Sequence, residues 1–192
     1  MKRHVFALAV SLALVIGCGT GDTRPSGPAT ATTSTSSGAA CSRGRAFVVV
    51  RHAEKASTDK DTSLSERGQA RAKVLASMLA SAGVTRLVAT QYKRTQETLA
   101  PLAERTSLTV DVRPAEKTAE LVGELRAAPD GAVVVIATHS NILPLIVKEL
   151  GGTQLRGVEG DTLPEDDYSR VVVITHACGA SLPFVMELGS DG

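Results

Sequence analysis

The sequence predicts an α/β domain whose mostly parallel sheet is covered by helices on both faces. Short apolar, β-branched runs alternate with helical patterns along the chain, which is the order of strand, helix and strand units. These runs are continuously apolar, as expected for strands that are buried on both faces. With 192 residues, 43% of them hydrophobic, the chain is long enough for one domain with a sizeable core.

Six runs are predicted to be strands and four segments to be helices. The strands are expected at residues 47–50, 87–90, 108–112, 132–138, 171–175 and 184–188. The helices are expected at residues 70–82, 95–104, 118–127 and 142–150. Four apolar residues lie at helical spacing on one face of the first helix, the pattern of an amphipathic helix: Val74, Leu75, Met78 and Leu79. Residues 157–167, with Gly, Pro and acidic residues, are expected to form an exposed loop.

The first 42 residues are expected to precede the folded domain of residues 43–192. A charged start at residues 1–4 leads into an apolar run, 5–16, which is too short to span a bilayer and is typical of an export signal. Its end, Val15-Ile16-Gly17-Cys18, resembles the lipobox of bacterial lipoproteins, in which the Cys is acylated. Residues 19–42, rich in Ser, Thr, Gly and Pro, are expected to be a disordered tether.

These features predict an exported protein that a lipid on Cys18 anchors to a membrane, facing the periplasm or the exterior. The alternative is an ordinary secretory signal and a secreted, soluble domain. Aromatic residues make up only 3% of the chain and Trp is absent, which argues against a nucleic-acid partner that stacks its bases on the protein. No histidine spacing supports a metal site, so neither a metal nor a cofactor is expected.

Polar side chains follow three of the predicted strands at the points where they end. Arg51 and His52 follow the first strand, Arg94 comes shortly after the second, and His139 follows the fourth. Ligands of an open α/β sheet bind beyond the carboxyl ends of its parallel strands, so these side chains are expected at one edge. Arginine forks bind phosphate oxygens, and a neutral imidazole can attack phosphorus to give a phosphohistidine that water hydrolyses. The sequence therefore predicts a phosphate-handling site.

Four ordered blocks resemble the histidine phosphatase superfamily, the phosphoglycerate mutase-like group. The blocks are Arg51-His52-Ala53-Glu54, Leu64-Ser65-Glu66-Arg67-Gly68, Arg94-Thr95-Gln96-Glu97-Thr98 and Thr138-His139-Ser140-Asn141. The resemblance implies that His52 is the nucleophile and that Arg51, Arg94 and His139 form the phosphate pocket, with Asn141 as a further substrate-binding residue. It also implies a three-layer domain with a six-stranded sheet, in which one strand, 171–175, is antiparallel to the first.

This sequence departs from the family pattern at three positions. Ala53 stands where Gly is usual, Lys55 where Thr or Ser is common, and Thr90 where Ser is usual. None of these changes removes a group that the chemistry requires.

The general acid that protonates the leaving oxygen is less well defined by the sequence. Glu116, after the third strand, is the best candidate, and a solvated residue that caps the next helix is its alternative role. Glu54 is expected to be structural, either orienting the local backbone or pairing with a neighbouring cation.

An antiparallel strand at 171–175 also places residues away from the site. His176, which follows it, is expected at the opposite edge of the sheet. Cys41 precedes the first strand and Cys178 follows the antiparallel one, so a Cys41–Cys178 disulfide is predicted at that edge for an exported protein, with two unpaired cysteines as the alternative.

The expected function is hydrolysis of phosphate monoesters through a phosphohistidine on His52, with a small phosphorylated molecule or a phosphoprotein as substrate. Two alternatives are a phosphomutase of the same family and a lipid-anchored protein that binds phosphate-bearing ligands without turnover.

Overall fold

The computed structural model describes residues 43–158 and 160–189. The predicted export signal with Cys18, the tether at 19–42 and Cys41 lie outside the described residues. In the part of the chain that is described, no helix has the length and apolar character needed to cross a membrane.

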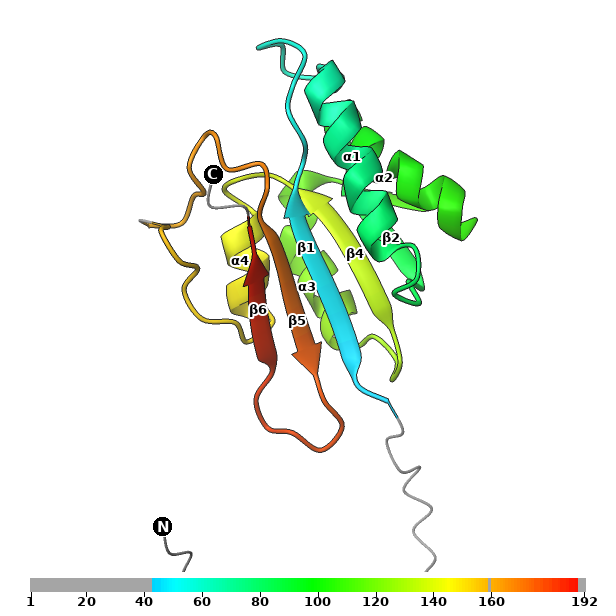
Figure 1. Cartoon of the computed structure of the whole chain (residues 1–192). Helices are drawn as coiled ribbons and strands as arrows, with labels where there is room; N and C mark the ends of the chain where they lie inside the picture. The colour runs from blue at the N-terminus through cyan, green and yellow to red at the C-terminus, as the bar shows by residue number, and fades with distance from the viewer. Residues whose placement is uncertain (1–42, 159, 190–192) are drawn as a thin grey trace, which may run out of the picture. The chain divides into compact units, whose positions relative to one another are not determined.

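Six strands form one mixed sheet in the order β3-β2-β4-β1-β5-β6 (Figure 1). Their bounds are β1 Arg45–Arg51, β2 Arg86–Thr90, β3 Val110–Arg113, β4 Val133–Thr138, β5 Val171–His176 and β6 Phe184–Leu188. Strands β1 to β4 are mutually parallel, whereas β5 pairs antiparallel with both β1 and β6. The predicted sheet, with a single strand running against the other five, is confirmed.

Helices cover both faces of this sheet. They are α1 Glu66–Leu79, α2 Lys93–Thr106, α3 Thr118–Arg126 and α4 Leu143–Glu149, with a short 3-10 helix, η1, at Ala115–Lys117. Alternate residues of β1 supply two separate cores, because side chains of a strand point to opposite faces. Phe47 and Val49 belong to the core under α3 and α4, and Val48 and Val50 to the core under α1 and α2.

The buried face of α1 differs from the predicted one. Val74 and Met78 are 59% and 54% exposed, and the buried residues are Gly68, Ala72, Leu75, Ala76 and Leu79. Small residues let the helix lie close to the chain beneath it. At Gly68, a Cβ atom would stand only 2.4 Å from the main-chain oxygen of Glu54, so the start of α1 touches the backbone that follows β1.

The segment predicted as an exposed loop, 157–167, is packed in part. Val158 and Leu163 are buried in the core under α3 and α4. The main-chain N–H of Leu163 donates to the carbonyl of Ser140, 3.0 Å away, which brings the segment onto the edge of the sheet where β4 ends. Burial of these two apolar side chains helps to hold the loop against the domain.

Candidate active site

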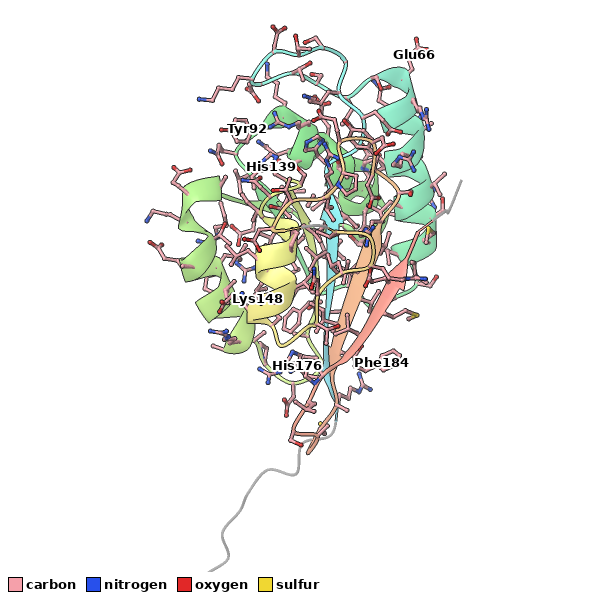
Figure 2. All side chains as sticks on the ribbon, turned by 90° about the vertical axis from the view of Figure 1, so that its left-hand side faces the viewer. Glu66, Tyr92, His139, Lys148, His176 and Phe184 are labelled. Atoms are coloured by element: carbon pink, nitrogen blue, oxygen red, sulfur yellow. The ribbon has the colours of Figure 1, made fainter. Side chains whose placement is uncertain are left out.

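The ends of β1, β4 and β2 bring the predicted site residues together. Arg51 and Thr138 are register partners at the ends of β1 and β4, and the N–H of His52 donates to the carbonyl of Thr138 at 2.8 Å. The rings of His52 and His139 consequently lie with their centroids 5.4 Å apart. Figure 2 shows His139 and Tyr92 near one another at this end of the sheet and His176 at the other end.

A cavity of about 370 Å³ opens at this edge. It is lined by Arg51, His52, Lys55, Thr58, Asp59, Lys60, Tyr92, Arg94, His139, Ser140, Asn141 and Glu165. The predicted nucleophile, all three predicted phosphate-pocket residues and Asn141 are in this set. Among the described residues, those that line the cavity are polar, charged or aromatic, so the site suits a small, polar, charged group.

His52 is held in one tautomer by its own backbone. Its Nδ1 lies 2.8 Å from the carbonyl oxygen of Ala53. A carbonyl can only accept, so Nδ1 carries the hydrogen and Nε2 keeps its lone pair when the ring is neutral. Burial, with smaller effects from Arg94 and Arg51, lowers the pKa of His52 to about 3. His52 is therefore a neutral imidazole near pH 7, as a nucleophile must be.

Arg51 is held from the side of the loop before β5. Its Nη1 donates to the carbonyls of Pro164 and Glu165 at 2.9 and 2.8 Å, and its guanidinium lies 4.3 Å from the ring centroid of Tyr168. These contacts occupy Nη1 and fix the plane of the guanidinium at the cavity. A charged group held this way stabilises developing negative charge without reorganising during the reaction.

Arg94 is held from two other directions. Its Nη1 donates to the carbonyl of Lys60 at 2.7 Å, and its guanidinium stacks on Tyr92 at 4.5 Å. The Nε atoms of Arg94 and Arg51 are both buried and have no hydrogen-bond partner among the described residues. Buried donors without partners are costly and tend to mark binding or catalytic sites.

Other residues of the motifs connect the segments that carry the site. Thr98 Oγ1 accepts from the N–H of Ala53 at 3.0 Å and donates to the carbonyl of Arg94 at 2.6 Å. A carboxylate oxygen of Glu97 accepts from the N–H of Leu64 at 2.7 Å. These bonds tie α2 to the chain that follows β1, so Arg94 and His52 keep a fixed spacing.

Glu54 has the structural role expected of it. The single N–H of Arg71 Nε is shared between the two carboxylate oxygens of Glu54 at 3.1 and 2.9 Å, and Arg71 Nη2 donates to Oε1 at 2.7 Å. The carboxylate also forms an ion pair with Arg67. The hydrogen bonds from Arg71 lower the pKa of Glu54. Glu54 thus holds α1 against the end of β1 and is not one of the residues that line the cavity.

The predicted general acid is not among the residues that line the cavity. Glu116 is exposed on η1, and its carboxylate accepts from Gln91 Nε2 at 3.4 Å. The carboxylates in the lining are those of Asp59 and Glu165. In the described part of the chain, no contact of Glu116 with the cavity residues His52, Arg51 or Arg94 supports its assignment as the proton donor, which stays a prediction.

The opposite edge of the sheet carries the residues expected there. His176 is the register partner of Arg45 at the start of β1, and its ring packs edge-on against Phe47 with centroids 5.7 Å apart. Cys178, just beyond β5, is disulfide-bonded. Its predicted partner, Cys41, lies outside the described residues, so the pairing stays a prediction.

Sequence reasoning missed several residues that shape the site, among them Tyr92, Tyr168, Lys60 and Glu165. The chain has only two tyrosines, and both stack on the arginines of the site. In a sequence with so few aromatic residues, the nearness of Tyr92 to Arg94 was a signal that could have been used. Tyr168 had no such local signal, because its partner is 117 residues away in the sequence.

Comparison with known proteins adds a family match to this geometry. Residues 47–116 match the model of the Histidine phosphatase superfamily (branch 1). This match supports the resemblance to the histidine phosphatase superfamily that the four motifs predict. It includes Arg51, His52 and Arg94, whereas His139 lies beyond it. No curated protein matches the chain in sequence.

Solved structures of three proteins named as phosphatases share the fold. A mycobacterial glucosyl-3-phosphoglycerate phosphatase is 18% identical, with a TM-score of 0.55 over 74% of this chain and 97% of that one. A candidate phosphohistidine phosphatase from Nakamurella multipartitia is 22% identical, with a TM-score of 0.51 over 74% and 95%. A candidate alpha-ribazole-5'-P phosphatase from Escherichia coli is 13% identical, with a TM-score of 0.59 over 77% and 97%.

Proposed function

We propose that this chain is a phosphatase of the histidine phosphatase superfamily that hydrolyses phosphate monoesters through a phosphohistidine on His52. The observation that carries the proposal is the state of His52, whose Nδ1 is bonded to the Ala53 carbonyl and whose pKa is lowered to about 3. A buried, neutral imidazole with a defined free nitrogen, set between two arginines, is suited to attack phosphorus.

The residues around His52 then have distinct roles. Nε2 of His52 attacks phosphorus and the leaving oxygen departs, taking a proton from an acid for which Glu116 remains our candidate. Arg51 and Arg94 bind the phosphoryl oxygens and stabilise the charge that develops on them, and Asn141 contacts the substrate. Water next attacks the phosphohistidine, which releases phosphate and returns His52 to its starting state.

Hydrolysis is favoured over a mutase reaction by the rim of the cavity. The rim contains exposed residues from two segments, Thr58, Asp59, Lys60 and Asn141. A mutase must keep water away from the phosphohistidine until the phosphoryl group has returned to the substrate. An exposed rim allows water to enter, and it accommodates either a small phosphorylated molecule or a phosphorylated side chain of a protein.

We further propose that the domain works outside the cytoplasm, held to a membrane by a lipid on Cys18 and separated from it by residues 19–42. The support for this comes from the sequence of residues 1–42 alone.

Release of p-nitrophenol from p-nitrophenyl phosphate tests the proposed reaction. The His52→Ala variant is expected to lose at least about a thousandfold in kcat/KM, because the nucleophile is gone. The matched control is His176→Ala, which removes a histidine at the opposite edge and should keep most of the activity.

Equal rates for the His52→Ala variant and the unchanged protein would exclude this mechanism. A protein that binds inorganic phosphate but releases no p-nitrophenol would instead support the binding-protein alternative. Quenching in alkali during turnover, which preserves the acid-labile N–P bond, should trap phosphate on His52 of the unchanged protein. A screen of phosphorylated metabolites and peptides would then define the substrate.

A further inference from the structure

Two buried hydroxyl groups connect His139 to the start of α2. His139 Nε2 lies 2.9 Å from Thr90 Oγ1, which in turn lies 2.9 Å from Thr95 Oγ1. Thr95 Oγ1 is 2.7 Å from the carbonyl of Tyr92 and 3.0 Å from that of Thr90. Exposed fractions are 8% for His139, 7% for Thr90 and 0% for Thr95, so water does not compete for these contacts.

Counting donors and acceptors favours one direction for each bond in this chain of contacts. The Thr95 hydroxyl lies within 3.0 Å of two carbonyls, which only accept, so we assign its single hydrogen to a carbonyl. The Thr90 hydroxyl must then donate to Thr95 Oγ1. Because the single hydroxyl hydrogen of Thr90 is used in that bond, Thr90 Oγ1 can only accept from His139 Nε2. His139 Nε2 therefore carries a hydrogen.

The contact of the other ring nitrogen, Nδ1, independently indicates the same tautomer of His139. Nδ1 lies 3.4 Å from Nη2 of Arg94, and a guanidinium can only donate. Nδ1 is therefore the acceptor in this long contact and carries no hydrogen. Both nitrogens agree on a neutral ring protonated at Nε2.

We propose that Thr90 and Thr95 are positioning residues that fix His139 as the Nε2–H tautomer, so that its Nδ1 lone pair lies beside Arg94 at the phosphate site. This inference rests on the proposed function of the cavity as a phosphate site. It assigns a role to two residues that the phosphate chemistry alone does not involve.

The tautomer has a consequence for phosphate binding. Nδ1 can donate to a phosphate oxygen only after it has taken a proton, from water or from a phosphate monoanion. The groups facing His139 are the cations Arg94 and Arg51, the neutral ring of His52 and the ring of Tyr92. Burial and the two cations lower the pKa of His139 to about 4 in the free site. A bound phosphate dianion offsets these cations, so His139 is expected to gain a proton on binding.

Nitrogen-15 NMR of the histidine rings in the full chain tests this inference without turnover. At pH 7 the His139 ring, assigned by loss of its signals in His139→Asn, should show a protonated Nε2 and a bare Nδ1. Addition of inorganic phosphate should shift Nδ1 to the protonated range. A ring protonated at Nδ1 in the free protein would overturn the proposal.

Variants at Thr90 provide the second test. Thr90→Val keeps the shape and removes the hydroxyl, so His139 should show both tautomers and the inhibition constant of inorganic phosphate should rise about tenfold. Thr90→Ser should restore the single tautomer and the affinity. Thr106→Val, which removes a hydroxyl at the far end of α2, is the control and should leave both unchanged.

The two proposals can fail separately. A wild-type protein with the Nε2–H tautomer but no phosphatase activity would contradict only the proposed reaction. An active protein in which Thr90→Val leaves both the tautomer and phosphate affinity unchanged would contradict only the role of Thr90.

Discussion

At the scale of single residues, two histidines 5.4 Å apart differ through what their nitrogens contact. His52 gives its Nδ1 hydrogen to the carbonyl of the next residue, and in the tautomer proposed above His139 gives its Nε2 hydrogen to a threonine from another strand. The two rings would then face the site through Nε2 and through Nδ1, respectively. In the proposed mechanism, local hydrogen bonding rather than residue type distinguishes the nucleophile from the phosphate-binding ring.

The lowered pKa of His52 predicts activity that persists in mild acid. The ring is reactive when neutral, so protonation abolishes attack, and with a pKa of about 3 this occurs well below the ordinary histidine value of 6.5. In a profile of kcat/KM against pH, corrected for substrate ionisation, we expect no acid limb from the nucleophile between pH 7 and pH 5. Circular dichroism at each pH controls for unfolding. A limb centred near pH 6.5 in folded protein would contradict this prediction.

The candidate site residues could be predicted because they stand where parallel strands end. Arg51 is the last residue of β1, and His52 and His139 are the first residues after β1 and β4, at the carboxyl ends where an open sheet binds its ligands. The loop carbonyls that hold Arg51 could not be predicted in this way, since any residue type supplies a carbonyl. The same limit applies to Glu116, because the spacing along the chain does not say how far a loop residue reaches into a cavity.

At the scale of elements, the start of α1 packs directly against the backbone that follows β1. Gly68 faces the carbonyl of Glu54, and Ser65 caps the helix by accepting from the N–H of Gly68 at 3.1 Å. The same Glu54 carbonyl accepts from the N–H of Ser65 at 2.9 Å. The periodicity of the sequence placed Val74 and Met78 with Leu75 and Leu79, but a helix that approaches this closely buries its small residues instead. Hydrophobic spacing alone does not contain that information.

Replacing Gly68 by Ala is expected to lower the free energy of unfolding by about 1 to 3 kcal/mol, because the new Cβ would force α1 away from Glu54. Gly123→Ala in α3 is the matched control. Nothing lies within 4 Å of that Cβ position, so the change should leave stability unchanged or raise it by up to about 1 kcal/mol. Urea unfolding measures both, and equal effects of the two changes would show that the close approach at Gly68 is unimportant.

At the scale of the whole molecule, the reversed direction of β5 places the residues that follow it at the edge of the sheet opposite the candidate site. Its start lies at the edge that holds His52, and its end carries His176 to the opposite edge, next to the start of β1. Cys178 follows at that same edge. The antiparallel strand beside the first could be expected from the family resemblance, whereas the strand pattern of the sequence indicated only a mostly parallel sheet.

The predicted Cys41–Cys178 disulfide would join the end of β5 to the chain that enters β1. We expect digestion of unreduced protein to give a linked pair of peptides that contain these two residues. Its removal in Cys178→Ser should cost about 2 to 4 kcal/mol of stability, and Cys41→Ser should cost the same. If mass spectrometry finds both thiols free, or if the double variant is less stable than either single one, the pairing is wrong.

Because β5 runs in the reverse direction, the chain must return from the end of α4 to the edge of the sheet that holds His52. The returning segment supplies three things to the site. The carbonyls of Pro164 and Glu165 accept from Arg51, the ring of Tyr168 stacks on Arg51, and Glu165 lines the cavity. If the proposed phosphatase reaction is correct, residues 160–168 form one continuous stretch that can be redesigned to change which phosphate esters are accepted. Redesign there would leave every motif residue and all six strands intact.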